Sequence, residues 1–126
     1  MPQTVIQYVL SRLRQLGVTD VFGVPGDYAF PVNDAICADK NMNYIGSCNE
    51  INAAYSADGY ARIKGLAAVN TTSGPGELNA LSGICGAYAE HVPIFHLTAN
   101  RAERWNGIVQ SYTTPSATVS SISSMI

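Results

Sequence analysis

Apolar and polar positions along most of the chain follow two periods, which predict helices and short buried strands in alternation. Helical periodicity, marked by capping residues or terminal glycines, predicts helices at residues 4–16, 32–38, 50–64 and 77–90. The first helix carries on one face Val5, Tyr8, Val9, Leu13 and Leu16. Apolar runs too short for a helix predict strands at residues 21–24, 43–47, 66–72 and 93–98.

Strand, turn and helix recur in this order, which is the pattern of a parallel sheet with helices on both faces. The sequence therefore predicts an α/β fold, a doubly wound parallel sheet that occupies residues 1–98 as one domain. Ligands of such sheets bind beyond the carboxyl ends of the strands. Three junctions that follow predicted strands carry candidate chemical groups, at residues 25–28, 47–50 and 72–76.

Two acids and a glycine-containing loop occupy these junctions. Glu50 opens an apolar helix, where an acid either complements the helix dipole or presents its carboxylate to a ligand. Asp27 lies in a Pro-Gly-Asp-Tyr turn, where Asp is more often a turn former than a catalyst. The Gly-Pro-Gly loop at 74–76 precedes a helix and so suits an anion, but it matches neither the Walker nor the dinucleotide motif. Taken singly, these signals are weak.

Composition excludes several classes of function. With 126 residues and a net charge of −2, the chain has room for one domain and has no basic patch for nucleic acid. It has no apolar stretch of the roughly 20 residues that a membrane span needs, and its start does not resemble a signal peptide. Three widely spaced cysteines, Cys37, Cys48 and Cys85, fit neither a zinc site nor a disulfide framework. We therefore expect a cytoplasmic protein that binds neither nucleic acid nor membranes.

Taken together and in order, the motifs resemble those of thiamine-diphosphate-dependent 2-keto-acid decarboxylases, the enzymes that act on pyruvate, indolepyruvate or phenylpyruvate. The segments that carry the resemblance are FGVPGDY at 22–28, NEINAAYSADGYAR at 49–62, GPGEL at 74–78 and GAYAEHVP at 86–93. The similarity runs from about Thr4 to Thr98 and its motifs are long and specific. It identifies the first 98 residues as the pyrimidine-binding domain of this family.

The resemblance implies roles for individual residues. Glu50 matches the glutamate that hydrogen-bonds a ring nitrogen of the cofactor's aminopyrimidine and favours its imino tautomer, whose exocyclic nitrogen deprotonates the thiazolium carbon. Asp27 matches an active-site aspartate that manages protons during the reaction. The other residues that the resemblance places at thiamine diphosphate are Pro25, Gly26, Thr72, Gly74 and Pro75.

The resemblance also implies a reaction and partners. A 2-keto acid would lose carbon dioxide without oxidation and leave as an aldehyde, with Mg2+ and the diphosphate held by a C-terminal domain that this chain lacks. The family assembles as dimers or tetramers with shared active sites. Small residues of the helix that Glu50 opens would suit a subunit interface, namely Ala53, Ala54, Ala57 and Ala61. The chain alone is expected to be inactive.

Two positions depart from the family pattern. Ser73 stands where an aromatic residue is expected, and Pro75 where a small apolar residue is expected. Because proline has no backbone N–H, Pro75 cannot contact the cofactor through an amide hydrogen.

The chain after Thr98 changes character. It has no charged residue from 105 to 126, and Ser and Thr dominate from Ser111 onward, which predicts an irregular tail at residues 99–126. The family's next motifs, Gly-x-Pro-Ser and His-His-Thr-Leu-Gly-Asp-Gly, are absent. Degenerate codons for residues 98–101 and 111–119, read from each third base, permit both motifs in that order. We favour a shifted reading frame over a divergent Ser/Thr-rich tail.

Three other functions stay open at this stage. A relative resembling acetolactate synthase would join two carbon fragments with the same cofactor, although the Asp27 turn favours a decarboxylase. A non-catalytic assembly module would keep the fold and lose the response to thiamine. A Rossmann dinucleotide-binding domain is the weakest alternative, because its glycine fingerprint is absent.

Overall fold

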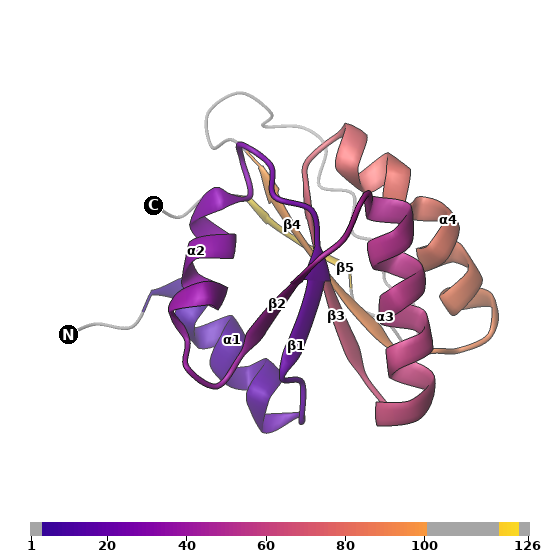
Figure 1. Ribbon diagram of the computed structural model, residues 1–126, viewed down its shortest axis with the longest axis horizontal. Helices are drawn as coiled ribbons and strands as arrows, with labels where there is room; N and C mark the ends of the chain where they lie inside the picture. The colour runs from indigo at the N-terminus through magenta and orange to yellow at the C-terminus, as the bar shows by residue number, and fades with distance from the viewer. Residues whose placement is uncertain (1–3, 101–118, 124–126) are drawn as a thin grey trace.

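The computed structural model describes residues 4–100 and the backbone of a strand at residues 119–123. The helices are α1 (Val5–Gln15), α2 (Phe30–Ala38), α3 (Glu50–Lys64) and α4 (Pro75–Ala89). The strands are β1 (Asp20–Gly23), β2 (Asn43–Gly46), β3 (Ala67–Thr72), β4 (Ile94–Asn100) and β5 (Val119–Ser123). All neighbouring strands are parallel, in the order β2-β1-β3-β4-β5 (Figure 1).

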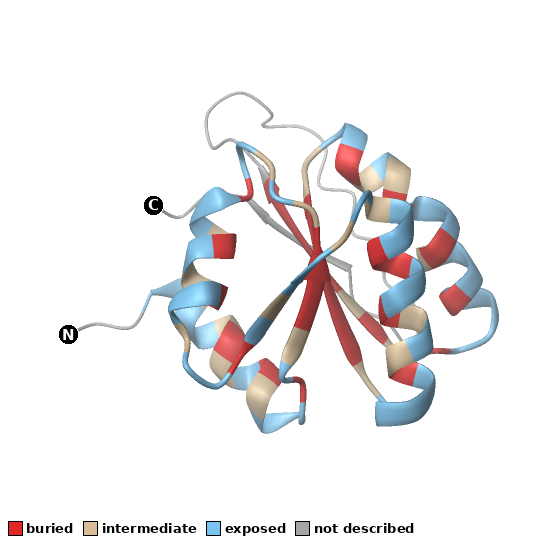
Figure 2. Cartoon of the chain, in the orientation of Figure 1, coloured by how far each residue is buried: buried red, intermediate tan, exposed pale blue. Residues whose placement is uncertain are grey.

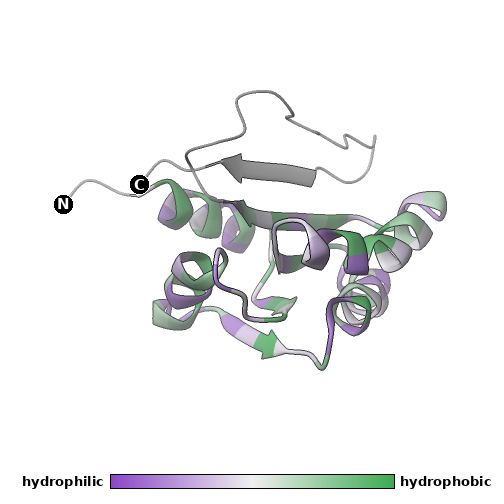
Figure 3. Ribbon diagram, turned by 90° about the horizontal axis from the view of Figure 1, so that it is seen from above, coloured by the Kyte–Doolittle hydropathy of each residue, from purple (hydrophilic) through white to green (hydrophobic). Residues whose placement is uncertain are grey.

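Two apolar layers hold the helices against opposite faces of this sheet. Figure 1 shows α1 and α2 on one side and α3 and α4 on the other, and the view from above in Figure 3 shows the same separation. Successive residues of β3 serve the two layers, since Ala68 packs with Leu10 and Leu13 whereas Val69 packs with the alanines of α3. The first five residues of β3 are buried, and Figure 2 shows the strands in the middle of the sheet in red. The predicted doubly wound α/β fold is confirmed.

Local signals define most helix ends. The side chain of Thr4 accepts a hydrogen bond from the backbone N–H of Gln7 at 3.3 Å, and that of Asn49 accepts one from Asn52 at 2.9 Å. Gly65 ends α3 with a φ of 90°, in the left-handed region that glycine tolerates. α4 begins two residues earlier than predicted, because Pro75 serves as its first residue, where no intrahelical donor is needed.

The apolar face predicted for the first helix is only partly the face that the structure buries. α1 buries Leu10 and Leu13 in the core, whereas Val5, Tyr8 and Leu16 are 44%, 56% and 65% exposed. The prediction was wrong here because α1 has two apolar stripes, one with Leu10 and Leu13 and one with Val5, Tyr8 and Leu16. Only packing against α2 and the sheet determines which stripe is buried.

The alanine face of α3 lies inside the domain. Ala53, Ala54, Ala57 and Ala61 are all buried within the chain, and three of them belong to the cluster around Val69 and Ile94. The prediction that this face serves a subunit interface is therefore wrong. The residues are small because α3 packs closely against α4 and β3.

A fifth strand lies within the range predicted to be an irregular tail. β5 pairs in parallel with β4, in a register that sets Val119 opposite His96. The sequence pattern does not predict β5, because the segment VSSIS lacks the alternation of a half-buried strand. Residues 101–118 and 124–126 lie outside the described residues, so for them the irregular tail stays a prediction.

Two buried side chains pair beneath the α3–α4 layer. Thr71 Oγ1 lies 2.8 Å from His96 Nε2, and both side chains are buried in the sheet. Burial lowers the pKa of His96 from 6.5 to about 4, and the Glu77 carboxylate opposes this only in part. His96 is therefore a neutral core residue at physiological pH.

Acid should destabilise the chain through His96. The folded state holds this imidazole neutral, so between its ordinary pKa of 6.5 and the folded value of about 4 the unfolded state binds one more proton. The associated stability is complete above pH 6.5 and is lost as the pH falls toward 4, by up to about 3 kcal/mol. Urea unfolding at pH 7 and pH 4.5 should show a smaller acid-induced loss for His96→Gln than for the wild type. Equal losses in the two proteins would exclude His96 as the source.

Two glycines of α4 should respond oppositely to alanine. A Cβ at Gly83 would lie 2.6 Å from the Cβ of Ala54 on α3, whereas a Cβ at Gly86 would meet nothing within 4 Å. Gly83→Ala should lower the free energy of unfolding by about 1–3 kcal/mol, because the helices must separate. Gly86→Ala should raise it by about 0.5–1 kcal/mol, because alanine has less backbone freedom to lose. Thermal and urea unfolding of both variants would measure this, and a stabilising Gly83→Ala would contradict the close packing.

Candidate functional site

The predicted site residues converge at the carboxyl end of β3. A Cβ added to Gly26, in the loop after β1, would lie 2.7 Å from the Cβ of Thr72. A Cβ added to Gly76, in the first turn of α4, would lie 3.0 Å from Thr72 Cγ2 and 3.3 Å from Glu50 Oε1. Gly26, Thr72, Gly76 and Glu50 therefore form one contiguous cluster. It lies where β1 and β3 are neighbours and the order of strands reverses, which is where doubly wound sheets bind ligands.

Glu50 presents its two carboxylate oxygens to different neighbours. It is the first residue of α3, directly after the Asn49 cap, where the helix dipole favours a negative charge. Oε2 accepts a hydrogen bond of 2.6 Å from Nδ2 of Asn79 on α4, while Oε1 lies toward Gly76. The start of α3 thus aims a carboxylate into the cluster, and Asn79 of α4 fixes one of its oxygens.

Asn79 is the site residue that the sequence analysis missed. It follows Gly76 by three positions on α4, and that spacing puts both residues on the same face of a helix. This is the signal that would have found it, once Gly76 had been placed at the site. The contact between Gly83 and Ala54 brings the two helices close enough for Asn79 to reach Glu50.

The Glu77 carboxylate, in the first turn of α4, binds the loop that precedes this helix. Gly74 donates its backbone N–H to Glu77 Oε2 at 2.8 Å, and the Ser73 hydroxyl donates to the same oxygen at 3.3 Å. The interpretation of this loop as a cradle for an external anion is therefore not supported at Gly74. Gly74 and Pro75 are both exposed, beside the cluster rather than within it.

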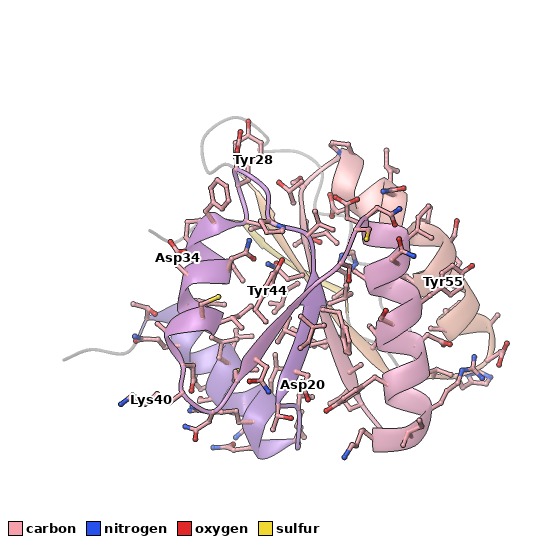
Figure 4. The ribbon with its side chains drawn as sticks, viewed as in Figure 1. Asp20, Tyr28, Asp34, Lys40, Tyr44 and Tyr55 are labelled. Carbon is pink, nitrogen blue, oxygen red and sulfur yellow. The ribbon has the colours of Figure 1, made fainter. Side chains whose placement is uncertain are left out.

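The turn that carries Asp27 leads directly from the cluster. Ala29 donates its N–H to the carbonyl of Gly26 at 2.8 Å and so closes the turn, in which Pro25 and Asp27 are exposed. Tyr28, labelled in Figure 4, marks this turn at the carboxyl edge of the sheet. Within the described ranges, no hydrogen bond joins Asp27 to Glu50. The structure thus brings Gly26 into the cluster and leaves the Asp27 carboxylate at its rim.

A buried polar contact anchors the helix that follows this turn. Asn33 of α2 accepts a hydrogen bond from the side-chain amide of Asn70 of β3, and both side chains are buried. Because a buried amide is costly without a partner, this pair fixes α2 relative to β3. Asn33, on the α2 side of this contact, lies within the helix that follows the 25–28 turn.

The described residues contain neither a candidate membrane span nor a candidate metal cluster. Within residues 4–100 and 119–123, no helix is long and apolar enough to cross a membrane. The same residues contain no group of three or more His, Cys, Asp or Glu side chains that would suit a metal ion.

Comparison with known proteins shows which family the chain resembles. Residues 3–122 match the family described as thiamine pyrophosphate enzyme, N-terminal TPP binding domain. The alpha-keto-acid decarboxylase of Mycobacterium leprae (strain TN) is 52% identical over 94 residues, which are 75% of this chain and 16% of that protein. The alpha-keto-acid decarboxylase of Mycobacterium ulcerans (strain Agy99) is 49% identical over 104 residues, which are 82% of this chain and 18% of that protein. The alpha-keto-acid decarboxylase of Mycobacterium tuberculosis (strain ATCC 25618 / H37Rv) is 52% identical over 94 residues, which are 75% of this chain and 17% of that protein.

The chain thus spans about one sixth of the length of these curated relatives. The family match covers nearly all of its residues, including the whole doubly wound domain that carries Glu50. The chain belongs to the thiamine pyrophosphate enzyme family, of which it carries the N-terminal TPP-binding domain.

Proposed function

We propose that this chain supplies the pyrimidine-binding half of the active site of a thiamine-diphosphate-dependent 2-keto-acid decarboxylase. The observation that carries the proposal is the Glu50 carboxylate, held at the switch point of the sheet among Gly26, Thr72 and Gly76. Identity of about half to relatives named alpha-keto-acid decarboxylase supports the same reaction. The substrate would be a 2-keto acid of the pyruvate, indolepyruvate or phenylpyruvate type, and the product an aldehyde.

The residues of the cluster fit an aminopyrimidine ring. Glycine at position 76 leaves Glu50 Oε1 accessible, since a side chain there would begin 3.3 Å from that oxygen. Oε1 would meet the ring nitrogen, and Gly26 and Thr72 would pack beside the ring. Pro25, Gly74 and Pro75 would form the rim, and since Glu77 occupies the N–H of Gly74 and Pro75 has none, they would contribute no amide donor.

Glu50 and Asp27 would divide the proton chemistry between them. Thiamine diphosphate supplies, when bound, the carbon nucleophile and the electron sink for decarboxylation. Glu50 would share a proton with the ring nitrogen at Oε1. Asp27, exposed at the rim of the cluster, would exchange protons with the reacting groups as a general acid or base.

The rest of the enzyme would lie outside this chain. We propose that Mg2+ and the diphosphate bind to a further domain, that the complete enzyme is a cytoplasmic homo-oligomer, and that the chain alone is inactive. Apolar side chains exposed on α3 and α4 support an association surface that is distinct from the buried alanine face. They are Ile51, Tyr55, Ile63, Leu78, Leu81 and Tyr88.

A carboligase resembling acetolactate synthase is the second candidate function. The same Glu50 geometry would serve it, because both reactions begin with the same activation of the cofactor. Asp27 favours the decarboxylase, since those relatives usually lack this acid. Product analysis separates the two, because a carboligase would convert pyruvate into a longer keto acid rather than an aldehyde. A non-catalytic assembly module would give neither product and no response to thiamine diphosphate.

Replacement of Glu50 tests the proposal in the full-length enzyme. Glu50→Gln should lower kcat for aldehyde release about 100-fold or more, because the amide cannot share a carboxyl proton with the ring nitrogen. Glu90→Gln is the matched control, since the Glu90 side chain is 61% exposed at the far end of α4, and it should leave kcat unchanged. Activity of Glu50→Gln close to that of the wild type would remove the basis of the proposal.

We also propose that residues 99–126 are read in a shifted frame. Alignments of 94 residues are short enough to lie within residues 1–98, which is compatible with a break in similarity near Thr98. An alignment of 104 residues must pass Thr98, and the family match reaches residue 122, and both of these favour a true tail. Resequencing the gene through the Thr98 codon should reveal a single-base change that restores Gly-x-Pro-Ser and His-His-Thr-Leu-Gly-Asp-Gly. An intact frame with neither motif downstream would refute the shift.

A further inference from the structure

We infer that Asn79 is a positioning residue, which selects the oxygen that Glu50 offers to the aminopyrimidine ring. The inference rests on the proposed function of Glu50. It concerns the side chain of α4 that donates a hydrogen bond to Glu50 Oε2 of α3 at 2.6 Å.

The hydrogen bond makes the two carboxylate oxygens unequal. An amide nitrogen donates only, and it neither gains nor loses a proton over the physiological range. Oε2 therefore accepts this hydrogen bond. Because the acceptor is an ionisable carboxyl group, the bond is of a kind that is stronger than a hydrogen bond between two neutral groups. Oε1, which faces Gly76, is left as the oxygen for the ring nitrogen. Without Asn79 the carboxylate would be able to rotate, and either oxygen would face the site.

The packing of α4 on α3 holds Asn79 in place. Gly76, Ala80, Gly83 and Ala87 form the buried face of α4, and Gly83 lies directly against Ala54. Asn79 is half-buried beside this face, so its amide projects across a fixed distance to the start of α3. The hydrogen bond joins residues 29 positions apart in the chain and thus depends on tertiary packing.

Nuclear magnetic resonance of the labelled full chain tests the bond directly. Glu50→Gln should shift the side-chain amide proton of Asn79 upfield, and Asn79→Leu should shift the carboxyl carbon of Glu50. Asn52→Leu is the matched control on α3, because Asn52 is exposed, and it should leave the Glu50 signal unmoved. Urea unfolding of each variant confirms that it is folded. A Glu50 carboxyl signal that is the same in the wild type and in Asn79→Leu would overturn the inference.

Binding of 4-amino-2,5-dimethylpyrimidine tests whether the bond positions Glu50. Followed through the Glu50 carboxyl signal, the affinity of this probe should fall about tenfold in Asn79→Leu. Asn79→Asp has nearly the same shape but lacks the donor at neutral pH, so it should lose at least as much. Retained affinity in Asn79→Asp would show that the side chain acts through shape alone and would overturn the inference.

The two measurements separate failure of the inference from failure of the proposed function. Equal binding of the probe by the wild type and both variants would overturn the positioning role and leave the function of Glu50 standing. A wild-type chain whose Glu50 carboxyl signal does not respond to millimolar probe would contradict the pyrimidine site itself, and the positioning role with it.

Discussion

The close contact between α3 and α4 is the constraint on which the site depends. A glycine on one helix lies against an alanine on the other, so near that a single added methyl at Gly83 would lie 2.6 Å from Ala54. Such an approach is available only to very small side chains. It brings the first turns of both helices to the same end of β3, where Glu50 opens one helix and Gly76 and Asn79 lie on the other. The distance between the two helices thus determines whether the Glu50 carboxylate has a hydrogen-bond partner on α4.

The carboxyl edge of the sheet combines a fixed part and an exposed part. Buried polar pairs lie beneath it on both faces, Asn33 with Asn70 and Thr71 with His96, and they anchor β3 and α2 without reaching solvent. Above them, Glu50, Thr72 and the glycine backbones line the cluster, while the turn with Asp27 is exposed. A rigid base with a carboxylate in a defined orientation suits recognition of a flat heterocycle, because little ordering remains for the ligand to impose.

Residues whose roles are local could be recognised from the sequence. Asn49 and Gly65 bound α3 as predicted, because a cap and a left-handed glycine act within one helical turn. The alternation of strand and helix predicted a sheet with helices on both faces. The junctions that follow the strands predicted where Glu50, Gly26 and Thr72 lie. The stripe of α1 that is buried, the internal position of the alanine face and the strand β5 were not predicted, because each depends on which neighbour is present rather than on the segment itself.

The fold class, the family and the position of the candidate acid follow from the periodicity of the chain and from long motifs read in order. The tertiary structure alone decided which groups touch. It showed that Asp27 lies at the rim and that Asn79 holds one oxygen of Glu50. These two kinds of contact differ in how far apart their residues lie in the sequence. Caps and turns form between residues a few positions apart. The contact between Asn79 and Glu50 spans 29 positions and exists only because two helices pack at the short distance that glycine and alanine permit.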